Sequence, residues 1–498
     1  MTATTREQRF PSLSHWGAFT AVVKAGRLVA CEAFAKDSAP SDILRSMPGM
    51  MHSSLRINRP AIRRGWLERR ENNDHSARGS DAYVEVSWDV ALKCVAEELH
   101  RVRTEHGSES IFGGSYGWSS AGRLHHARTL THKFLNAGGG CVNQAGNYSW
   151  GAAQFLLPHV IGTYSPVTGR VTDWNNVVAH TQLFLAFGGL ALRNAQITSG
   201  GAGDHTTSGW ITRAALAGVA FVIISPTKSD VPVGLNARWV PIRPNTDTAM
   251  MLGMLHTLLD AGLVDNAFIQ SYCTGFDQLR MYVLGTKDGQ PKNATWASSI
   301  CGIPADLIRD LAFEAATKRS IINCTWSLQR AHHGEQPYWM VVTLAAMLGQ
   351  IGLPGGGFGV GYGATNMMGN AVARFPGPTL PQGQNKVSAF IPVARFVDML
   401  ENPGGDFTYN GKTHQYPDIE LVYWAGGNPF HHHQDLNRMT RAWRKPGAVI
   451  VHEQFWTATA KMADVVLPAT TMLERDDIGY STRERFMVAM KRAIDPLA

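Results

Sequence analysis

A single serine stands between two aromatic residues in the stretch NQAGNYSWGAAQ, at positions 143–154. Small residues after Ser149 indicate the start of a helix, where a serine hydroxyl commonly accepts a hydrogen bond from a backbone N–H group. The serine could instead be a hydrolase nucleophile. The Gly-x-Ser-x-Gly elbow is only half matched, however, because Asn147 stands where the first glycine is needed. A ligand role is the third option, and the local sequence leaves all three open.

Two further aromatic residues, Tyr116 and Trp118, lie upstream in GGSYGWSSAGRLHHARTL, at positions 113–130. Rings with one polar tip are usually buried in a core. The phenol and the indole N–H can also donate hydrogen bonds to a bound group. From the residues alone, both interpretations stay open.

Residue types that bind metals are present, but their spacing argues against a metal site. Three consecutive histidines stand at 431–433. Consecutive side chains point in different directions, so they seldom bind one zinc ion, and we expect a polar loop. The cysteines form no CxxC pair, which disfavours an iron–sulfur cluster, a zinc ribbon or a disulfide framework and favours free thiols in a reducing compartment. They are Cys31, Cys94, Cys141, Cys273, Cys301 and Cys324.

The elements that must position these residues can be predicted from local patterns. Apolar and polar residues alternate around Ala25-Gly26, which is typical of a β-hairpin. After residue 181, apolar strands alternate with helical stretches, which indicates βαβ units and a parallel sheet. We expect a hairpin at 17–34, a helix at 88–105 with Ser87 as N-cap, strands at 183–187 and 219–225, and a helix at 248–262.

One pattern occurs twice. QLFLAFGGLALRNAQ (182–196) resembles ELVYWAGGNPFHHHQ (420–434), since each is an apolar strand followed by Gly-Gly and a polar segment. The strands that follow, within 220–242 and 448–469, are also alike. Two copies of one βαβ pattern suggest two similar nucleotide sites, although any two βαβ units share some likeness.

Length and composition limit the classes of protein to consider. The chain has 498 residues, 44% of them apolar, which is enough for several packed domains and excludes a disordered chain. The net charge is +7, and arginines cluster loosely only between Arg56 and Arg70. We therefore expect a basic interior that binds anionic cofactors, and no nucleic-acid partner.

The ends of the chain suggest a location and a missing part. No run of about 18 apolar residues occurs, and the opening MTATTREQRFPSLSHWG has no apolar signal segment. We expect a cytoplasmic protein without a membrane segment. The chain stops shortly after the apolar stretch FMVAM (486–490), so we also expect a further domain beyond Ala498.

Five motifs follow one another over almost the whole chain: SYGWSSAGRLHHA, GNYSWGAAQ, TWSLQRAHHGEQPYWM, GGNPFHHHQDLNR and ADVVLPATTMLERDDIG. Together they resemble the dimethyl sulfoxide reductase family of molybdopterin oxidoreductases, in its S- and N-oxide reductase branch, and within it the biotin sulfoxide reductases. ADVVLP is common to the wider family and says nothing about the substrate. The resemblance implies an α/β, multidomain fold with mixed and doubly wound parallel sheets around a central cofactor, and a small β-rich N-terminal part.

The resemblance also implies domain boundaries. The small β-rich part would span 1–60 and return at about 376–414. Residues 61–165 with 415–498 would form one α/β domain, and 166–375 a doubly wound dinucleotide-binding domain. The C-terminal domain that closes over the cofactor in this family would be absent from these residues.

The implied cofactor is molybdenum held by two molybdopterin guanine dinucleotides (bis-MGD), without an iron–sulfur cluster. Ser149 stands at the position of the serine that binds the metal in this branch, and a hard, anionic oxygen donor suits a high-valent metal. Tyr116 would orient the oxide, Trp118 would position the oxo group, and Arg330 would anchor a polar group of the substrate. The residues implied to bind the dinucleotides are Arg193, Ser225, Asp230, Asp247, Trp326, Gln329, Asn428, His431, His433, Gln434, Glu453, Thr457 and Asp464.

The implied activity is removal of oxygen from an S-oxide, biotin sulfoxide first and methionine sulfoxide second, with electrons from an external donor. The alternative within the class is reduction of trimethylamine N-oxide or dimethyl sulfoxide. Two alternatives from other classes are a serine hydrolase with Ser149 as nucleophile and a non-catalytic nucleotide-binding fragment. Ester hydrolysis that disappears in Ser149→Ala would support the hydrolase.

Overall fold

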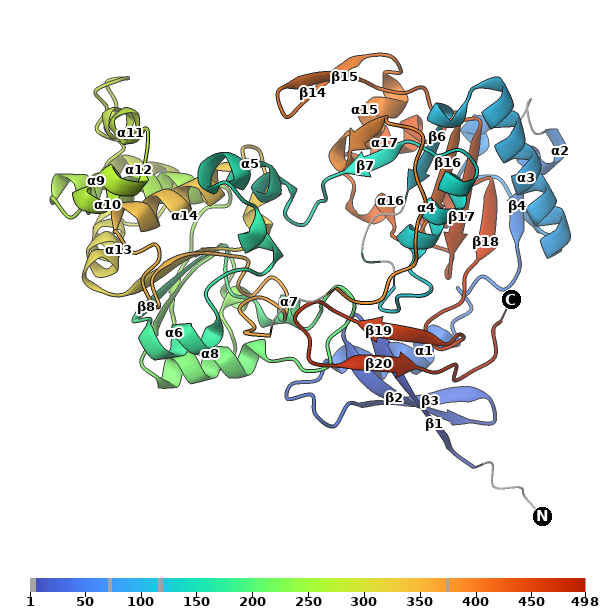
Figure 1. Cartoon of the computed structure of the whole chain (residues 1–498), viewed down its shortest axis with the longest axis horizontal. Coiled ribbons are helices and arrows are strands. Elements are labelled where there is room, and N and C mark those ends of the chain that lie inside the picture. Colours follow the sequence, from blue (N-terminus) through green and yellow to red (C-terminus); the bar gives the residue numbers. More distant parts are fainter. Residues whose placement is uncertain (1–5, 70–73, 115–117, 119, 373–375, 498) are drawn as a thin grey trace. The chain divides into compact units, whose positions relative to one another are not determined.

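The computed structural model describes residues 6–69, 74–114, 118, 120–372 and 376–497. Tyr116 therefore lies outside the described residues. The chain forms two compact units, coloured along the sequence in Figure 1. Unit 1 comprises Met1–Tyr148, Ser199–Gly203 and Phe375–Ala498, and unit 2 comprises Ser149–Thr198 and Asp204–Arg374. Each unit is a set of residues that contact one another more than they contact the rest of the chain. The domain boundaries expected from the sequence are not tested by this division and stay predictions.

Unit 2 is built on a five-stranded parallel sheet with the strand order β10-β9-β8-β11-β12. The chain runs from β8 outwards to β9 and β10, then returns to the other side of β8 for β11 and β12. The loops after β8 and β11 thus leave the sheet at a topological switch point, where such sheets bind ligands. The strands are β8 (Leu183–Phe187), β9 (Ala220–Ile224), β10 (Arg238–Val240), β11 (Ser320–Cys324) and β12 (Gly357–Val360).

Helices cover both faces of this sheet (Figure 1). Leu183, Leu185 and Phe187 of β8 pack into one buried core, whereas Phe184 and Ala186 pack into another. The sheet is therefore doubly wound, as predicted. The first face carries α5 (Gly151–Ile161), α9 (Asp247–Asp260), α12 (Ala294–Cys301), α13 (Ala305–Thr317) and α14 (Gln336–Met347), and the second α6 (Trp174–His180) and α8 (Thr207–Leu216). The unit also contains α7 (Leu192–Ala195), α10 (Asn266–Tyr272) and α11 (Phe276–Val283).

Unit 1 contains a six-stranded mixed sheet with the order β5-β4-β18-β17-β16-β6. β6, β16, β17 and β18 are parallel to one another. β4 pairs antiparallel with β18, and β5 pairs antiparallel with β4. The strands are β4 (Ala61–Arg63), β5 (Tyr83–Glu85), β6 (Ile111–Gly114), β16 (Leu421–Ala425), β17 (Ala448–Glu453) and β18 (Val465–Pro468). One face packs on α3 (Trp88–Glu105) and α4 (Ala127–Ala137), and the other on α15 (Phe396–Glu401) and α17 (Leu436–Ala442).

Smaller elements complete unit 1. An antiparallel sheet, β1-β2-β3, forms the β-rich N-terminal part, and its Leu13 shares a small core with Met490 of the β19–β20 hairpin. These elements are β1 (Gln8–Ser14), β2 (Gly17–Lys24), β3 (Arg27–Ala33), α1 (Met47–Met51), α2 (Arg64–Arg69), β7 (Asn143–Ala145), β13 (Phe390–Pro392), β14 (Asp406–Tyr409), β15 (Lys412–Gln415), α16 (Pro429–His432), β19 (Asp477–Tyr480) and β20 (Met487–Met490).

Most local predictions are confirmed. β2 and β3 form the expected hairpin, and its turn has positive φ at Ala25 and Gly26. α3 begins where expected, with the Ser87 hydroxyl accepting a hydrogen bond from the Val90 amide at 3.4 Å. The repeated pattern corresponds to two parallel triplets, β8-β9-β10 and β16-β17-β18. The α/β fold class with mixed and doubly wound sheets is therefore confirmed.

The structure excludes one of the three options for Ser149. α5 begins at Gly151, so Trp150 and not Ser149 occupies the N-cap position, and no side chain at that position makes a capping bond. Among the described residues, the Ala152 amide instead donates a hydrogen bond to the distant Gln329 side chain. Ser149 is therefore not a helix cap.

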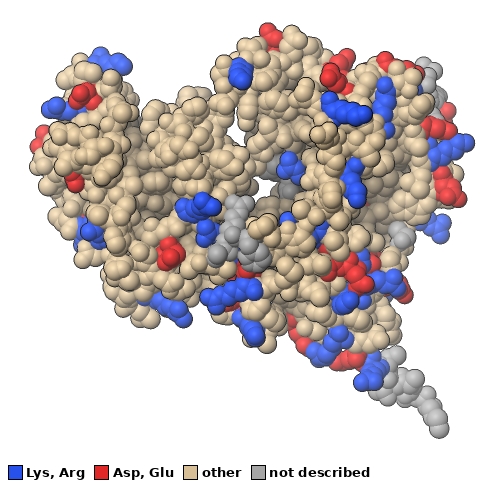
Figure 2. Space-filling view, in the orientation of Figure 1, with Lys and Arg blue, Asp and Glu red and all other residues tan. Residues whose placement is uncertain are grey.

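Two arginines of the loose basic cluster are buried, whereas Arg59 and Arg64 are exposed. Arg56 is buried in an ion pair with Glu474, and Arg63 is buried in one with Asp464, each at 2.8 Å. On the face shown in Figure 2, basic and acidic side chains are interspersed. Within the described part of the chain, no helix is both long and apolar enough to cross a bilayer.

Candidate functional site

In unit 2, the predicted site residues gather at the carboxyl edge of the sheet. Parallel strands end at the same edge, so the segments after β8, β9, β10 and β11 lie together. Two of these segments touch, because a Cβ on Gly188 would lie 2.3 Å from the Thr325 side chain. Arg193 follows β8, Ser225 and Asp230 follow β9, Asp247 follows β10, and Trp326, Gln329 and Arg330 follow β11.

Three side chains surround the carboxylate of Asp230. It accepts hydrogen bonds from the hydroxyls of Ser225 and Thr227, the latter at 2.9 Å, and it forms an ion pair with Arg193. The Arg193 guanidinium also donates to the Ser229 carbonyl at 3.0 Å. Because Asp230 is already satisfied, this cluster shapes the loop after β9 and leaves the exposed part of Arg193 for an anionic group.

Asp247 differs from Asp230, because it is buried without full pairing. The side chain opens α9 and is 2% exposed, and its Oδ1 atom has no hydrogen-bond partner among the described residues. Burial raises the pKa of Asp247 to about 7. An unsatisfied buried acceptor is costly, so this carboxyl is suited to a ligand that brings N–H donors.

Trp326 offers the complementary group. Its indole is 7% exposed, and Nε1 donates to none of the described residues. The nearby Gly361 has φ of +89°, and a Cβ there would lie 2.4 Å from Trp326 Nε1, so glycine keeps this space open. Gln329 is buried and caps α5, whereas Arg330 is exposed and forms no ion pair with a described residue.

In unit 1, a second set of predicted residues lies at the carboxyl edge of the parallel strands. Asn428, His431, His433 and Gln434 follow β16, while Glu453 ends β17 and Thr457 follows it. Asn428 accepts a hydrogen bond from the Thr459 hydroxyl at 2.6 Å. Glu453 accepts one from the Thr457 hydroxyl at 3.3 Å, and burial raises its pKa. Thr459 was missed by the sequence reasoning, although it stands in the same TATA segment as Thr457.

Asp464 does not join this set. It precedes β18 and so lies at the amino edge of the sheet, where it is fully buried. Its carboxylate binds Arg63 at 2.8 Å, Arg78 at 2.6 Å and the Val449 amide at 2.9 Å. The expected contact of Asp464 with a dinucleotide is therefore not supported by its position, since its oxygens are used to hold the sheet together.

Trp118 follows β6 at the carboxyl edge of the unit 1 sheet. Its ring centroid lies 5.5 Å from that of His15, a histidine whose pKa burial lowers to about 4, so the two rings pack as neutral groups. The turn after Trp118 is held by Arg475, which donates to the Ser120 hydroxyl at 3.1 Å, and by Asp477, which accepts from the Leu124 amide at 2.8 Å. Both stand in the quoted LERDDIG segment, but nothing in the sequence pairs them with this turn.

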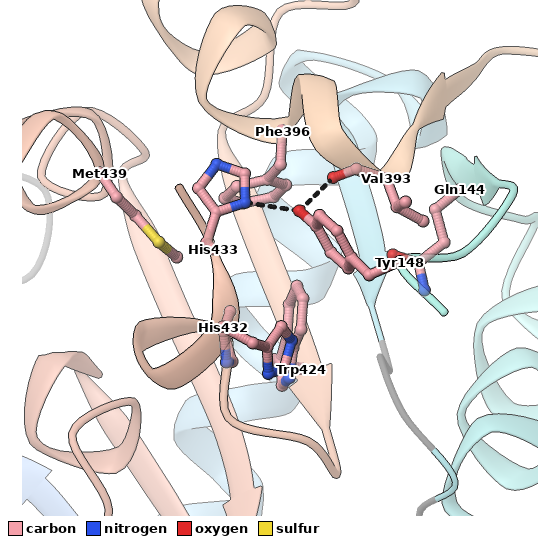
Figure 3. A pocket seen from close by; sticks show the side chains of 9 residues that line it. Gln144, Tyr148, Val393, Phe396, Trp424, His432, His433 and Met439 are labelled. Carbon is pink, nitrogen blue, oxygen red and sulfur yellow. Dashed lines mark hydrogen bonds between the residues drawn. The ribbon is translucent and has the colours of Figure 1, made fainter. Parts of the chain in front are cut away.

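His433 forms a hydrogen bond with Tyr148, the residue that precedes Ser149. Figure 3 shows the Tyr148 hydroxyl between His433 Nδ1, at 2.6 Å, and the Val393 carbonyl, at 2.9 Å. These side chains line a pocket with Gln144, Phe396, Trp424, Pro429, His432 and Met439. No cluster of three or more metal-ligand side chains of His, Cys, Asp or Glu occurs in the described part of the chain, and none of the six cysteines forms a disulfide bond with a described residue.

Two protein-family models match this chain. Residues 56–498 match the molybdopterin oxidoreductase family, and residues 12–52 match the molybdopterin oxidoreductase N-terminal domain. The chain belongs to the molybdopterin oxidoreductase family. The cofactor of this family is molybdopterin with molybdenum.

Several relatives within this molybdopterin oxidoreductase family reduce S- or N-oxides, according to their names. A biotin sulfoxide reductase of Cereibacter sphaeroides is 45% identical over 94% of this chain and 63% of its own length. A dimethyl sulfoxide/trimethylamine N-oxide reductase of the same organism is 46% identical over 97% of this chain and 60% of its own length. A trimethylamine-N-oxide reductase of Haemophilus influenzae is 41% identical, also over 97% and 60%. This chain thus spans about 60% of the length of these curated relatives.

The fold is also similar to a solved structure. Acetylene hydratase from Pelobacter acetylenicus matches 98% of this chain and 66% of its own with a TM-score of 0.66. At 17% identity, this likeness concerns the fold alone.

The residues of unit 2 fit the cofactor of this molybdopterin oxidoreductase. Pterin rings present both N–H donors and acceptor atoms at their edges. Asp247 supplies a buried acceptor atom without a described partner, and Trp326 supplies a buried N–H donor without one. A heterocyclic ligand at this edge would therefore satisfy polar groups that are costly to leave unpaired.

Proposed function

We propose that this protein removes the oxygen atom from an S-oxide, with biotin sulfoxide as the first substrate, using molybdenum held by two molybdopterin guanine dinucleotides. The observation that carries the proposal is the pair of matching sheet edges. In each unit, a parallel triplet of strands begins with a strand followed by Gly-Gly, and the predicted cofactor residues collect beyond it, except Asp464. Two edges of one kind suit two dinucleotides.

The predicted residues of each unit would bind a different dinucleotide. Asp247 and Trp326 would meet the N–H and acceptor groups of one dinucleotide, with Ser225, Asp230 and Arg193 shaping the loop beside it. Asn428, Glu453 and Thr457 would serve the other, with His431 and Gln434, both exposed after β16. The backbone N–H groups of these loops favour phosphate oxygens.

When bound, molybdenum would supply the two-electron redox change that the reaction needs. The Ser149 Oγ atom would bind the metal as a hard oxygen ligand. Tyr116 would donate a hydrogen bond to the oxide oxygen of the substrate, Trp118 would orient that oxygen through its indole N–H, and Arg330 would bind a polar or anionic group of the substrate. In the overall reaction, an S-oxide, two electrons and two protons give the sulfide and water, so an external electron donor is required.

Trimethylamine N-oxide or dimethyl sulfoxide reduction is the second candidate. It is favoured by the 46% identity to a reductase named for these two substrates, which is as high as the identity to the biotin sulfoxide reductase. The cytoplasm is our proposal for the location, and six cysteines outside disulfide bonds are consistent with a reducing compartment. The family assignment leaves the serine hydrolase alternative without support.

The test is elemental analysis and nucleotide release on full-length protein from a molybdate-supplied host. One molybdenum and two GMP per chain are expected, together with reduction of biotin sulfoxide faster than of dimethyl sulfoxide or trimethylamine N-oxide. Ser149→Ala should lose the metal signal and the activity. Protein without molybdenum would overturn the proposal, and faster N-oxide reduction would favour the second candidate.

A further inference from the structure

Two glycines flank the segment that carries Ser149, Gly146 on its amino side and Gly151 on its carboxyl side. Gly146 follows β7 with φ of +77°, and Gly151 opens α5. A Cβ added at either glycine would meet no described atom within 4 Å. The path of the backbone between these glycines therefore depends on the side chains that it carries.

Tyr148 is anchored within unit 1 on the amino side of Ser149. Its hydroxyl lies 2.9 Å from the Val393 carbonyl oxygen and 2.6 Å from His433 Nδ1, from two segments far apart in the sequence (Figure 3). The ring also makes T-shaped contacts with His432 and His433, at centroid distances of 5.7 and 6.1 Å. Tyr148 is therefore held in two ways: its hydroxyl makes two hydrogen bonds, and its ring packs against two histidine rings.

The direction of the two hydrogen bonds follows from their chemistry. A carbonyl oxygen only accepts, so the single proton of the Tyr148 hydroxyl goes to Val393. The phenol oxygen then accepts the bond from His433, which places a proton on His433 Nδ1. Burial lowers the pKa of His433, so the ring is neutral near pH 7 and its Nε2 atom carries a lone pair.

The surroundings make this anchor firm. Phe396, Trp424, Pro429 and Met439 line the same pocket and add apolar surface around these hydrogen bonds. Hydrogen bonds are electrostatically stronger in such surroundings, and losing one partner leaves the other unsatisfied. The Tyr148 hydroxyl is thus well placed to determine where its peptide lies.

We propose that Tyr148 is a positioning residue for Ser149, because its bonds to Val393 and His433 fix the peptide that carries the metal-binding serine. The Cα atoms of neighbouring residues are about 3.8 Å apart, so a shift at Tyr148 passes directly to Ser149. The inference rests on the proposed function of Ser149. It also gives His433 a role other than cofactor contact, which is to donate a hydrogen bond to the Tyr148 hydroxyl.

Tyr148→Phe in the full-length protein tests the anchor, since it removes only the hydroxyl. Amide hydrogen exchange at 146–150 should accelerate by about three- to tenfold, the effect expected from losing a hydrogen bond of ordinary strength. The electron paramagnetic resonance signal of the partly reduced metal should also change, because it reports the position of the serine ligand. His433→Leu should act like Tyr148→Phe, whereas His433→Asn, which keeps an N–H donor near the Nδ1 position, should restore slow exchange.

A matched control is available in the same unit. The hydroxyl of Tyr423 lies 2.7 Å from His452 Nε2 in the sheet formed by β16 and β17, so Tyr423→Phe removes a tyrosine–histidine bond of the same kind. It should leave both the exchange at 146–150 and the metal signal unchanged. Wild-type exchange in Tyr148→Phe, or equal effects of both variants, would overturn the inference. Wild-type protein without molybdenum would overturn the proposed function, while the exchange result would still decide whether Tyr148 is an anchor.

Discussion

The Gln329 side-chain oxygen accepts a hydrogen bond from the Ala152 backbone amide at 2.7 Å. Both residues belong to unit 2, and the bond caps α5 from a segment that is 177 residues away in the chain. The free N–H groups of a helix N-terminus need such a partner when local side chains do not supply one. Gln329, expected as a cofactor contact, thus also fixes the carboxyl side of the segment that carries Ser149.

Gln329→Leu should therefore loosen the start of α5. Loss of a helix cap costs about 1 kcal/mol, which corresponds to roughly fivefold faster hydrogen exchange of amides near Ala152. Mass spectrometry of exchanged peptides covering α5 would measure this. Gln329→Glu keeps an acceptor oxygen and should retain slow exchange; equally fast exchange in both variants would show that the carboxamide oxygen is not the cap.

A second prediction concerns Asp464, whose buried carboxylate pairs with Arg63 and Arg78. Asp464→Asn removes the charge and leaves two buried guanidinium groups undercompensated, which should lower the free energy of unfolding by roughly 3–5 kcal/mol. Glu401→Gln is the control in the same unit. The side chain of Glu401 is 28% exposed in its ion pair with Arg438, so that variant should lose at most about 1 kcal/mol.

The measurement for Asp464 is urea unfolding combined with the GMP content of the folded protein. We expect lower stability but unchanged GMP per folded chain. Selective loss of GMP with normal stability would restore Asp464 as a cofactor residue.

Local sequence patterns predicted the elements well because the causes of these elements are local. The strand at Leu183–Phe187 was bounded correctly by its continuous apolar run, and α3 by the Ser87 cap. The repeat of strand and Gly-Gly also corresponded to real parallel triplets, which indicated the edges where the predicted cofactor residues gather.

The helix-cap option for Ser149 and the cofactor assignment of Asp464 fail to match the observed contacts because those contacts involve distant residues. Trp150 occupies the N-cap position of α5, and the Ala152 amide is capped by Gln329, which lies far along the chain. Asp464 is held by Arg63, which precedes it by 401 residues, and no local pattern shows such a partner. The position of Asp464 before its strand was a usable signal, since it places the residue at the amino edge, away from the predicted site.

Gly122 should tolerate no side chain. A Cβ there would lie 2.0 Å from the Asp477 carboxylate, which accepts hydrogen bonds from the amides of Leu124 and His125 and so shapes the turn after Trp118. Gly122→Ala should lower the unfolding free energy by about 1–3 kcal/mol and reduce turnover at constant molybdenum content. Gly209→Ala in α8, where a Cβ meets no described atom within 4 Å, should instead be neutral or slightly stabilising. Thermal unfolding and single-substrate kinetics would compare the two variants.

The final prediction is a pH dependence due to Asp247. Burial raises its pKa in the folded protein to about 7, above its ordinary value of 3.8. Between these values the folded state binds more protons than the unfolded state, so stability falls as the pH rises through this window. The loss should approach roughly 4 kcal/mol by pH 8 in protein prepared without cofactor.

Asp247→Asn removes this titration and should flatten the fall in stability between pH 4 and 7, as measured by urea unfolding at several pH values. Asp260→Asn, at the exposed end of the same helix α9, should leave the wild-type profile unchanged. In cofactor-loaded protein, N–H donors from a bound base would favour the charged carboxylate, so the pH-dependent loss should shrink. A wild-type profile that is already flat without cofactor would contradict the unpaired burial of Asp247, because its carboxylate would then be stabilised by the protein itself.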